Sequence, residues 1–210
     1  MAYDFLQAEG RSFLADNLIS SVAPPFTLSI RQNYPNITAT RGVCGIYTSG
    51  STSNNFNLQN NANGTLQVIA FETSDPGSPS VTLPGADIWW NALGLYASTT
   101  SRKAYANTTA GAEVTTSRNV TGVNSLVIGR RGNNIGVSFT GKLAEFAIWN
   151  VALTDAEINS LSQGFKPSRI RPQSLLYYVP LVRNVQELYS GIPFTASATA
   201  PTVFDHPRVY

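Results

Sequence analysis

The stretch TGKLAEFAIWNVALTDAEINSLSQG, residues 140–164, decides the fold because it contains a strand, a turn and a helix in direct succession. After Gly141 the residues alternate with the period of two that is typical of a strand. One face would carry Ala144, Phe146 and Ile148, and the other Leu143, Glu145, Ala147 and Trp149. Because both faces are mostly apolar, we expect this strand to be internal, with a facing sheet on one side and the following element on the other.

A short helix is predicted directly after this strand. Thr154 and Glu157 have the spacing of a capping box, in which each side chain accepts a hydrogen bond from the backbone amide of the other residue. Leu153 and Ile158 have the spacing of a hydrophobic staple, and Gly164 is placed to end the helix. The pattern predicts about two helical turns near residues 154–162.

This succession resembles the laminin-G-like and pentraxin-like branch of the concanavalin A-like jelly rolls. In that family a strand after a glycine ends in an aromatic-Asn pair, followed by an Ala-Leu-Thr/Ser turn and a short Glu-Ile helix. The corresponding residues are Gly141, Trp149, Asn150, Ala152, Leu153, Thr154, Glu157 and Ile158. The resemblance implies an all-β fold, a two-sheet antiparallel jelly-roll sandwich with one short helix near residues 154–162.

The domain organisation expected from the sequence has three parts. They are an N-terminal arm over residues 1–25, a laminin-G-like sandwich over 26–190 and a C-terminal tail over 191–210. Residues 49–63 are so rich in Gly, Ser, Thr and Asn that we expect turns or a short edge strand there. A strand predicted over residues 175–181 resembles one that usually opens such domains, and its late position suits a sandwich whose termini lie close together.

Composition limits the classes of function. The chain has 210 residues, a single large β-domain by our interpretation, and only 12% are charged, about half the usual share. The net charge of +2 gives no support for binding nucleic acid, which requires basic residues gathered on one face. Lys166, Arg169 and Arg171 form a basic cluster that we interpret as a solvated loop after the helix.

Several sequence features indicate where the protein is made and which partners it lacks. Cys44, the single cysteine, cannot form an internal disulfide, and its apolar neighbours predict a buried side chain. The N-terminal region has no apolar core of a signal peptide, and no window reaches the length of a membrane span. We therefore expect synthesis in a host cytoplasm and no membrane partner.

The sequence offers little material for catalysis or metal binding. Endoglucanases of the resembled fold carry a Glu-x-Asp-x-x-Glu strand, which is absent, so no enzyme activity is expected. His206 is the single histidine, which is too few for a multi-histidine metal site or a Ser-His-Asp triad. Asp75, Asp87 and Glu113 are isolated in the sequence, so no cofactor is expected, although a weak calcium site built from loop carbonyls stays open.

Two adjacent tryptophans raise the question of glycan binding, because sugars stack on exposed aromatic rings. The candidate glycan-binding residues are Trp89, Trp90 and Asn91. Strand alternation sends Trp89 and Trp90 to opposite faces, so at least one of them is expected in the core. The other would be the best single candidate for a glycan contact.

Two functional classes follow from these observations. The run Asp205-His206-Pro207-Arg208 resembles the tails of laminin-G-like proteins encoded by tailed bacteriophages. That resemblance favours a non-enzymatic virion structural protein, either a surface capsid decoration (cement) or a fibre subunit, which contacts other virion proteins and associates with itself. The alternative is a carbohydrate-binding, lectin-like module that recognises a host surface glycan.

Apolar residues at both ends of the chain are the candidate assembly interface. They are Tyr3, Phe5, Leu6, Phe204, Val209 and Tyr210. Chain ends normally fray, and ordering each residue costs about 1 to 2 kcal/mol of backbone entropy, so we expect these side chains to be covered. A neighbouring subunit could cover them, or both ends could pack on their own sandwich.

Overall fold

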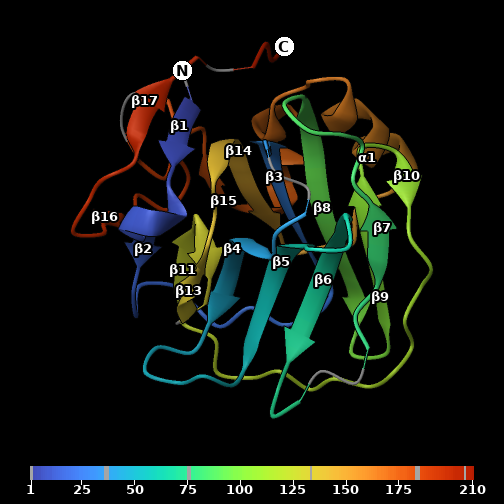
Figure 1. Ribbon diagram of the computed structural model, residues 1–210. Helices are drawn as coiled ribbons and strands as arrows, with labels where there is room; N and C mark the ends of the chain where they lie inside the picture. The colour runs from blue at the N-terminus through green and yellow to red at the C-terminus, as the bar shows by residue number, and fades with distance from the viewer. Residues whose placement is uncertain (1, 36–37, 75–76, 133, 183–184, 206) are drawn as a thin grey trace.

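Two antiparallel sheets, named sheet A and sheet B, pack face to face (Figure 1). The computed structural model describes residues 2–35, 38–74, 77–132, 134–182, 185–205 and 207–210. Within this part of the chain, one short α-helix accompanies the strands. The arrangement confirms the expected all-β, two-sheet antiparallel jelly-roll sandwich.

Sheet A is built around β14 (Gly141–Trp149). One edge of β14 pairs with β3 (Phe26–Asn33), and the other pairs with both β1 (Ala2–Phe5) and β15 (Leu175–Val179). The remaining described strands of sheet A are β8 (Trp89–Ser98), β9 (Ser101–Ala106), β10 (Thr109–Ala110) and β17 (Thr202–Phe204). The internal position predicted for the strand after Gly141 is confirmed.

Sheet B faces sheet A and runs in the order β16-β2-β11-β4-β5-β6-β7. Its strands are β2 (Phe13–Ala15), β4 (Arg41–Tyr47), β5 (Asn55–Asn61), β6 (Thr65–Phe71), β7 (Ser80–Thr82), β11 (Ser125–Ile128) and β16 (Thr195–Ala196). The other elements are the β12 (Arg130–Arg131) and β13 (Asn134–Ser138) hairpin, the α-helix α1 (Asp155–Ser162) and the 3-10 turns η1 (Gln7–Glu9), η2 (Pro167–Arg169) and η3 (Pro172–Ser174). The β12–β13 hairpin contacts β4 of sheet B.

The core between the sheets contains a cluster of aromatic rings. Phe26 of β3 and Tyr96 of β8 stack with their ring centroids 4.3 Å apart. Phe56 of β5 approaches Phe26 edge-on across the sandwich, at 4.9 Å between centroids. Cys44 is fully buried in the same core, as its apolar neighbours predict. Ring pairs of this kind stabilise packing beyond the area that they bury, so this cluster joins the two sheets.

A β-bulge at Glu145 interrupts the alternation predicted for β14. The register with β3 shifts between Ala144 and Ala147, and Glu145 has a φ of +54°. Phe146 faces the core between the sheets, as expected, but Leu143 lies in that core as well. The prediction that Leu143 lies on the opposite face from Phe146 is wrong, because the extra residue of a bulge re-aims the side chains beside it.

The helix forms where the sequence predicts it. Thr154 is the N-cap of α1, and its side chain accepts a hydrogen bond from the Glu157 amide. The Glu157 carboxylate accepts a hydrogen bond from the Thr154 amide at 2.8 Å, which completes the capping box. Ile158 packs with Trp149 of β14 in a second apolar cluster, on the outer face of sheet A. The helix thereby covers the face of β14 that points away from sheet B.

Strand β5 corrects the interpretation of residues 49–63 as turns or a short edge strand. It is seven residues long and lies between β4 and β6, inside sheet B. Asn60 of β5 and Gln32 of β3 are both fully buried, and their side-chain amides exchange hydrogen bonds of 2.7 and 3.3 Å. Composition is misleading here because a buried amide is tolerated when it finds a hydrogen-bond partner.

The two ends of the chain join the sheets and do not form separate arms. β1 pairs with β14 in sheet A, while β2 pairs with β11 in sheet B. β17, from the expected C-terminal tail, pairs with β1, so the two ends lie side by side (Figure 1). Tyr3 and Phe5 of β1 are buried in the core, and their burial accounts for the docking of this segment.

Two of the residues considered for metal binding, His206 and Asp75, lie outside the described residues. No helix in the described part of the chain is long and apolar enough to cross a membrane. Asp87 and Glu113 are described, and neither belongs to a group of three or more His, Cys, Asp or Glu side chains that could hold a metal ion in that part.

Phe146→Ala should lower the free energy of unfolding by about 3 to 5 kcal/mol, because truncating a fully buried ring leaves a cavity between the sheets. Urea denaturation measures this change. Phe165→Ala is the matched control, since that ring is 39% exposed and its loss should change stability by about 0.5 kcal/mol or less. Similar losses in the two variants would contradict the placement of Phe146.

Candidate functional site

The outer face of sheet A, which points away from sheet B, carries the candidate binding residues. α1 and the segment after it cover the middle of this face, where Leu153, Ile158 and Ile170 pack on Trp149. The Trp149 indole Nε1 donates a hydrogen bond to the Ile170 carbonyl at 2.7 Å, which holds that segment in place. Two pockets border the covered region, one beside β9 and one beside β15.

The three glycan-binding candidates occupy different environments. Trp90 is 1% exposed and lies in the core between the sheets, and Asn91 is 2% exposed. Asn91 Oδ1 accepts a hydrogen bond from Ser29 Oγ at 3.0 Å, and the backbone amide of Asn91 donates to Asn107 Oδ1 at 2.9 Å. Trp90 thus lies in the core, as expected of at least one of the two tryptophans, and neighbouring strands enclose Asn91, so neither of these two candidates is open to a surface ligand. Trp89 is half-buried and stays partly accessible.

The first pocket, of about 520 Å³, lies between β9, β10 and the start of α1. We name it the Tyr105 pocket, and its lining residues are Lys103, Tyr105, Thr108, Ala110, Asp155, Ile158 and Asn159. Strand alternation places Lys103 and Tyr105 on one face, and the helical spacing of four residues places Asp155 and Asn159 on one side of α1. A carboxylate, an amide, an ammonium and a hydroxyl group thus surround a phenol.

Hydrogen bonds and charges organise the Tyr105 pocket. The Tyr105 hydroxyl donates to Asp155 Oδ1 at 3.1 Å, which orients that carboxylate. Burial raises the pKa of Tyr105 to about 12, and the hydrogen bond and charge of Asp155 contribute to the same shift. Next to the pocket, Lys103 Nζ lies 3.6 Å from Glu113 Oε2. The hydrogen bond from Ser101, helped by the charge of Lys103, lowers the pKa of Glu113.

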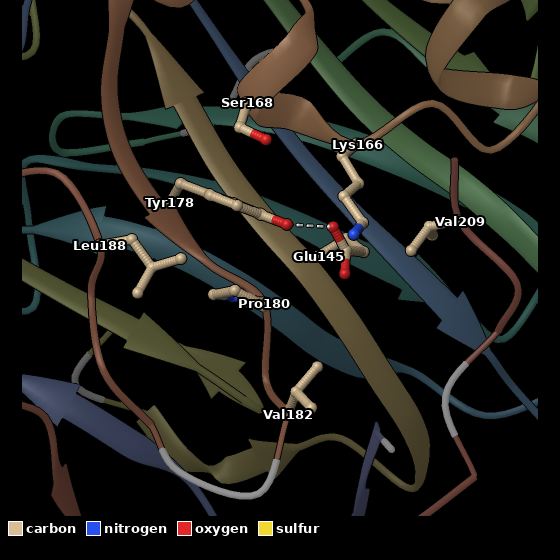
Figure 2. Close-up of a pocket in the computed structure, with 8 residues that line it drawn as sticks. All are labelled: Glu145, Lys166, Ser168, Tyr178, Pro180, Val182, Leu188 and Val209. Carbon is tan, nitrogen blue, oxygen red and sulfur yellow. Dashed lines mark hydrogen bonds between the residues drawn. The ribbon is translucent and has the colours of Figure 1, made fainter.

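The second pocket, of about 510 Å³, lies between β14, β15 and the C-terminal segment (Figure 2). We name it the Glu145 pocket, and its lining residues are Glu145, Lys166, Ser168, Tyr178, Pro180, Val182, Leu188 and Val209. The bulge turns the Glu145 carboxylate onto this face, where the Tyr178 hydroxyl donates to Oε2 at 2.6 Å. Burial raises the pKa of Tyr178, and the charge of Glu145 raises it further, so Tyr178 stays a hydrogen-bond donor.

The acids near the Glu145 pocket do not form the pair that glycoside hydrolysis uses. Such a pair flanks the scissile bond at about 5 to 9.5 Å. Glu145 is the one carboxylate among the described residues that line the pocket. Glu187 lies nearby in sequence to the wall residue Leu188, but its carboxylate accepts hydrogen bonds from the Tyr178, Tyr189, Ser190 and Gly191 amides. Glu187 therefore stabilises a turn.

The apolar residues at the chain ends divide into buried and exposed groups. Tyr3 and Phe5 are buried in this chain's own core, so their assignment to an assembly interface is corrected. Val209 lines the Glu145 pocket. The exposed members of the set are Leu6, Phe204 and Tyr210.

Sequence reasoning missed both pockets. It interprets Lys166 as part of a solvated loop and gives no binding role to Tyr105 or Asp155. The meeting of β9 with α1, and of β15 with the C-terminal segment, depends on tertiary packing. Strand alternation is the one signal that could have placed Lys103 and Tyr105 on a common face.

Two facing antiparallel sheets with a short helix on an outer face define a jelly roll of the concanavalin A-like class. The family model Laminin_G_3, described as the concanavalin A-like lectin/glucanases superfamily, matches residues 11–159. The chain therefore belongs to this superfamily, as the resemblance of residues 140–164 predicts. No curated protein matches the sequence.

Solved structures with a similar fold come from several sources. A native heptameric SAP-like pentraxin from Limulus polyphemus has a TM-score of 0.66 and 16% identity, covering 94% of this chain and 91% of that chain. A putative carbohydrate binding protein from Bacteroides ovatus has a TM-score of 0.60 and 18% identity, covering 97% and 61%. The CBM40 of Ruminococcus gnavus IT-sialidase, bound to α2,3-sialyllactose, has a TM-score of 0.54 and 16% identity, covering 77% and 92%. At these identities the likeness is one of fold.

Asp155→Asn should lower the pKa of Tyr105 from about 12 while leaving it above the ordinary value of 10.0, because burial is the larger cause and remains. Titration by NMR of tyrosine labelled at Cζ measures the shift, with Tyr105→Phe to assign the signal. Since folding raises this pKa, the contribution of Tyr105 to stability is present below pH 10 and is lost between about pH 10 and 12. An unchanged Tyr105 titration in Asp155→Asn would contradict the contact.

Proposed function

We propose that this protein is a carbohydrate-binding module and that the Tyr105 pocket is its site. The observation that carries the proposal is the set of polar groups around the Tyr105 ring. Asp155 and Asn159 are exposed on α1, and Thr108 is exposed after β9. Together with Lys103 they supply both donors and acceptors, as a polyhydroxylated ligand requires.

The shape and the lining of the pocket also suit a sugar. A volume of about 520 Å³ falls within the range of small-ligand sites, about 300 to 1,000 Å³. Tyr105 and Ile158 are 5% and 1% exposed and form the floor of the pocket, while the exposed Ala110 adds apolar surface beside the polar groups at the border. The Asp155 carboxylate is already oriented by Tyr105, so little side-chain entropy would be lost when a hydroxyl group binds to it.

The charge of the site favours a neutral glycan. Lys103 brings one positive charge, whereas Asp155 and the neighbouring Glu113 bring two negative charges. A carboxylated sugar would therefore meet net repulsion, and repulsion is an effective way to discriminate between ligands. The Ruminococcus gnavus module in the comparison is bound to a sialylated sugar. Because of the negative charge at its own site, we propose that this chain prefers neutral sugars instead.

Fold relatives support the general class. The Bacteroides ovatus structure is described as a putative carbohydrate binding protein, and the Ruminococcus gnavus structure contains a bound sugar. Fold alone does not determine function, so the argument depends on the residues of the Tyr105 pocket.

Binding should be measured on an array of neutral glycans together with their sialylated counterparts. We expect binding to neutral glycans, with weaker signals for the sialylated forms. Asp155→Ala should weaken the affinity for the neutral ligand about tenfold, because a hydrogen bond to a charged acceptor is lost. Asp205→Ala is the control, since Asp205 is exposed outside both pockets. Binding to no neutral glycan, or equal effects of the two variants, would refute the proposal.

A second candidate function, assembly into a larger particle, is favoured by the exposed apolar ends. Leu6, Phe204 and Tyr210 are 37%, 44% and 63% exposed. We propose that they mediate self-association, and that the partners in a virion would contact the same residues. This virion hypothesis comes from the phage-like C-terminal run, and copurification of the protein with phage particles tests it.

Changing all three exposed residues to serine should shift the protein toward the monomer, because less apolar surface would be buried between copies. Sedimentation velocity at several protein concentrations measures the shift. Leu18→Ser is a control, because Leu18 is 47% exposed and is not one of these end residues. If the parent protein is monomeric at all concentrations, self-association through these residues is wrong.

A further inference from the structure

We propose that the Glu145 pocket is a second binding site, which takes a small amphipathic carboxylate, an aliphatic chain that ends in one carboxylate group. The site is separate from the Tyr105 pocket, and the proposal does not depend on carbohydrate binding. It is carried by three features: exposed apolar walls, an unpaired cation at the polar end, and a buried acid that interacts with other groups of the protein.

Apolar side chains form the walls of this pocket (Figure 2). Val182 and Leu188 are 38% and 56% exposed, and Pro180 and Val209 complete the walls. Large aliphatic side chains exposed around a hollow leave apolar surface that a ligand can cover. The walls therefore select a ligand with an aliphatic part.

Backbone hydrogen bonds hold these walls in place. The Leu188 amide donates to the Tyr178 carbonyl at 2.9 Å. On the opposite side, the Lys166 amide donates to the Tyr210 carbonyl at 3.0 Å, which fixes the segment that carries Val209. Because the walls are formed before a ligand arrives, binding does not have to order them.

The polar end of the pocket supplies donors for an anion. Figure 2 shows the Lys166 amine directed into the pocket and the Ser168 hydroxyl at its border. Neither Lys166 Nζ nor Ser168 Oγ has a partner in the part of the chain that the structure describes. An ammonium and a hydroxyl group match the acceptor oxygens of a carboxylate.

The carboxylate of Glu145 is buried and interacts with other groups of the protein, so it is not the group that faces an incoming ligand. The Tyr178 hydroxyl donates to it at 2.6 Å. Burial lowers the pKa of Arg31 on the neighbouring strand β3, and the charge of Glu145 counteracts that shift, so these two groups interact. Glu145 is 2% exposed whereas Lys166 is exposed, and Lys166 is therefore the charge that a ligand meets at the opening.

Isothermal titration calorimetry with sodium octanoate tests the site on the full chain. We expect saturable binding of one octanoate per chain, and binding about tenfold weaker for octan-1-ol, which lacks the charge that pairs with Lys166. Lys166→Gln should weaken octanoate binding about tenfold and should remove the preference over octan-1-ol. Leu188→Ser should weaken both ligands alike, because it changes the wall and not the charge.

Lys142→Gln is the matched control. Lys142 lies on the same strand as Glu145, but its Nζ lies 3.7 Å from the centroid of the Phe204 ring, and it does not line the pocket. This variant should bind octanoate as the parent does. The absence of saturable octanoate binding would overturn the proposal, as would equal affinities for octanoate and octan-1-ol. An equal loss in the Lys166 and Lys142 variants would overturn it as well, since it would indicate general attraction to a basic protein.

Discussion

The pairing of β14 with two different strands along one edge is the constraint on which the rest of the structure depends. Residues 141–143 pair with β1, and residues 146–149 pair with β15. Glu145 lies between these two registers, where its φ of +54° takes one residue out of the regular ladder. The Glu145 amide donates to the Pro180 carbonyl at 3.2 Å, so the bulge also anchors the chain just beyond β15. One strand thereby organises segments from both ends of the sequence.

The two faces of β14 then divide the molecule into an inner core and an outer layer. Phe146 contributes to the aromatic core between the sheets, while Trp149 receives α1 and the segment after it on the other side. This outer layer consists of α1 and the segment after it. One pocket lies beside the layer at Tyr105, and the other lies beside it at Glu145. Both candidate pockets lie at the limits of the layer, and the packing that stabilises the helix also determines where ligands could bind.

Local patterns in the sequence predicted the class of fold, the capping box at Thr154 and the internal position of β14. They could not predict β5, because burial of its amides depends on partners such as Gln32 that are distant in sequence. The candidate site was predicted least well. Trp89, Trp90 and Asn91 are consecutive and therefore visible as a motif, whereas Tyr105 and Asp155 are 50 positions apart and meet through packing alone. A bulge such as the one at Glu145 also leaves no clear local signature, since positive φ at a glutamate is imposed by the surrounding ladder.

The pairing of β1 with β17 has a consequence for the order in which the protein can fold. Tyr3 pairs with Val203, so sheet A cannot be completed until the chain as far as Val203 has left the ribosome. Until then the backbone edge of β1 is open, and an open strand edge can pair with another chain. Contacts between residues so distant in sequence form slowly, because closing the long loop between them costs entropy before the favourable free energy of the contact is gained. The interval between synthesis of the first strand and synthesis of the last is thus the period in which newly made copies are most exposed to aggregation.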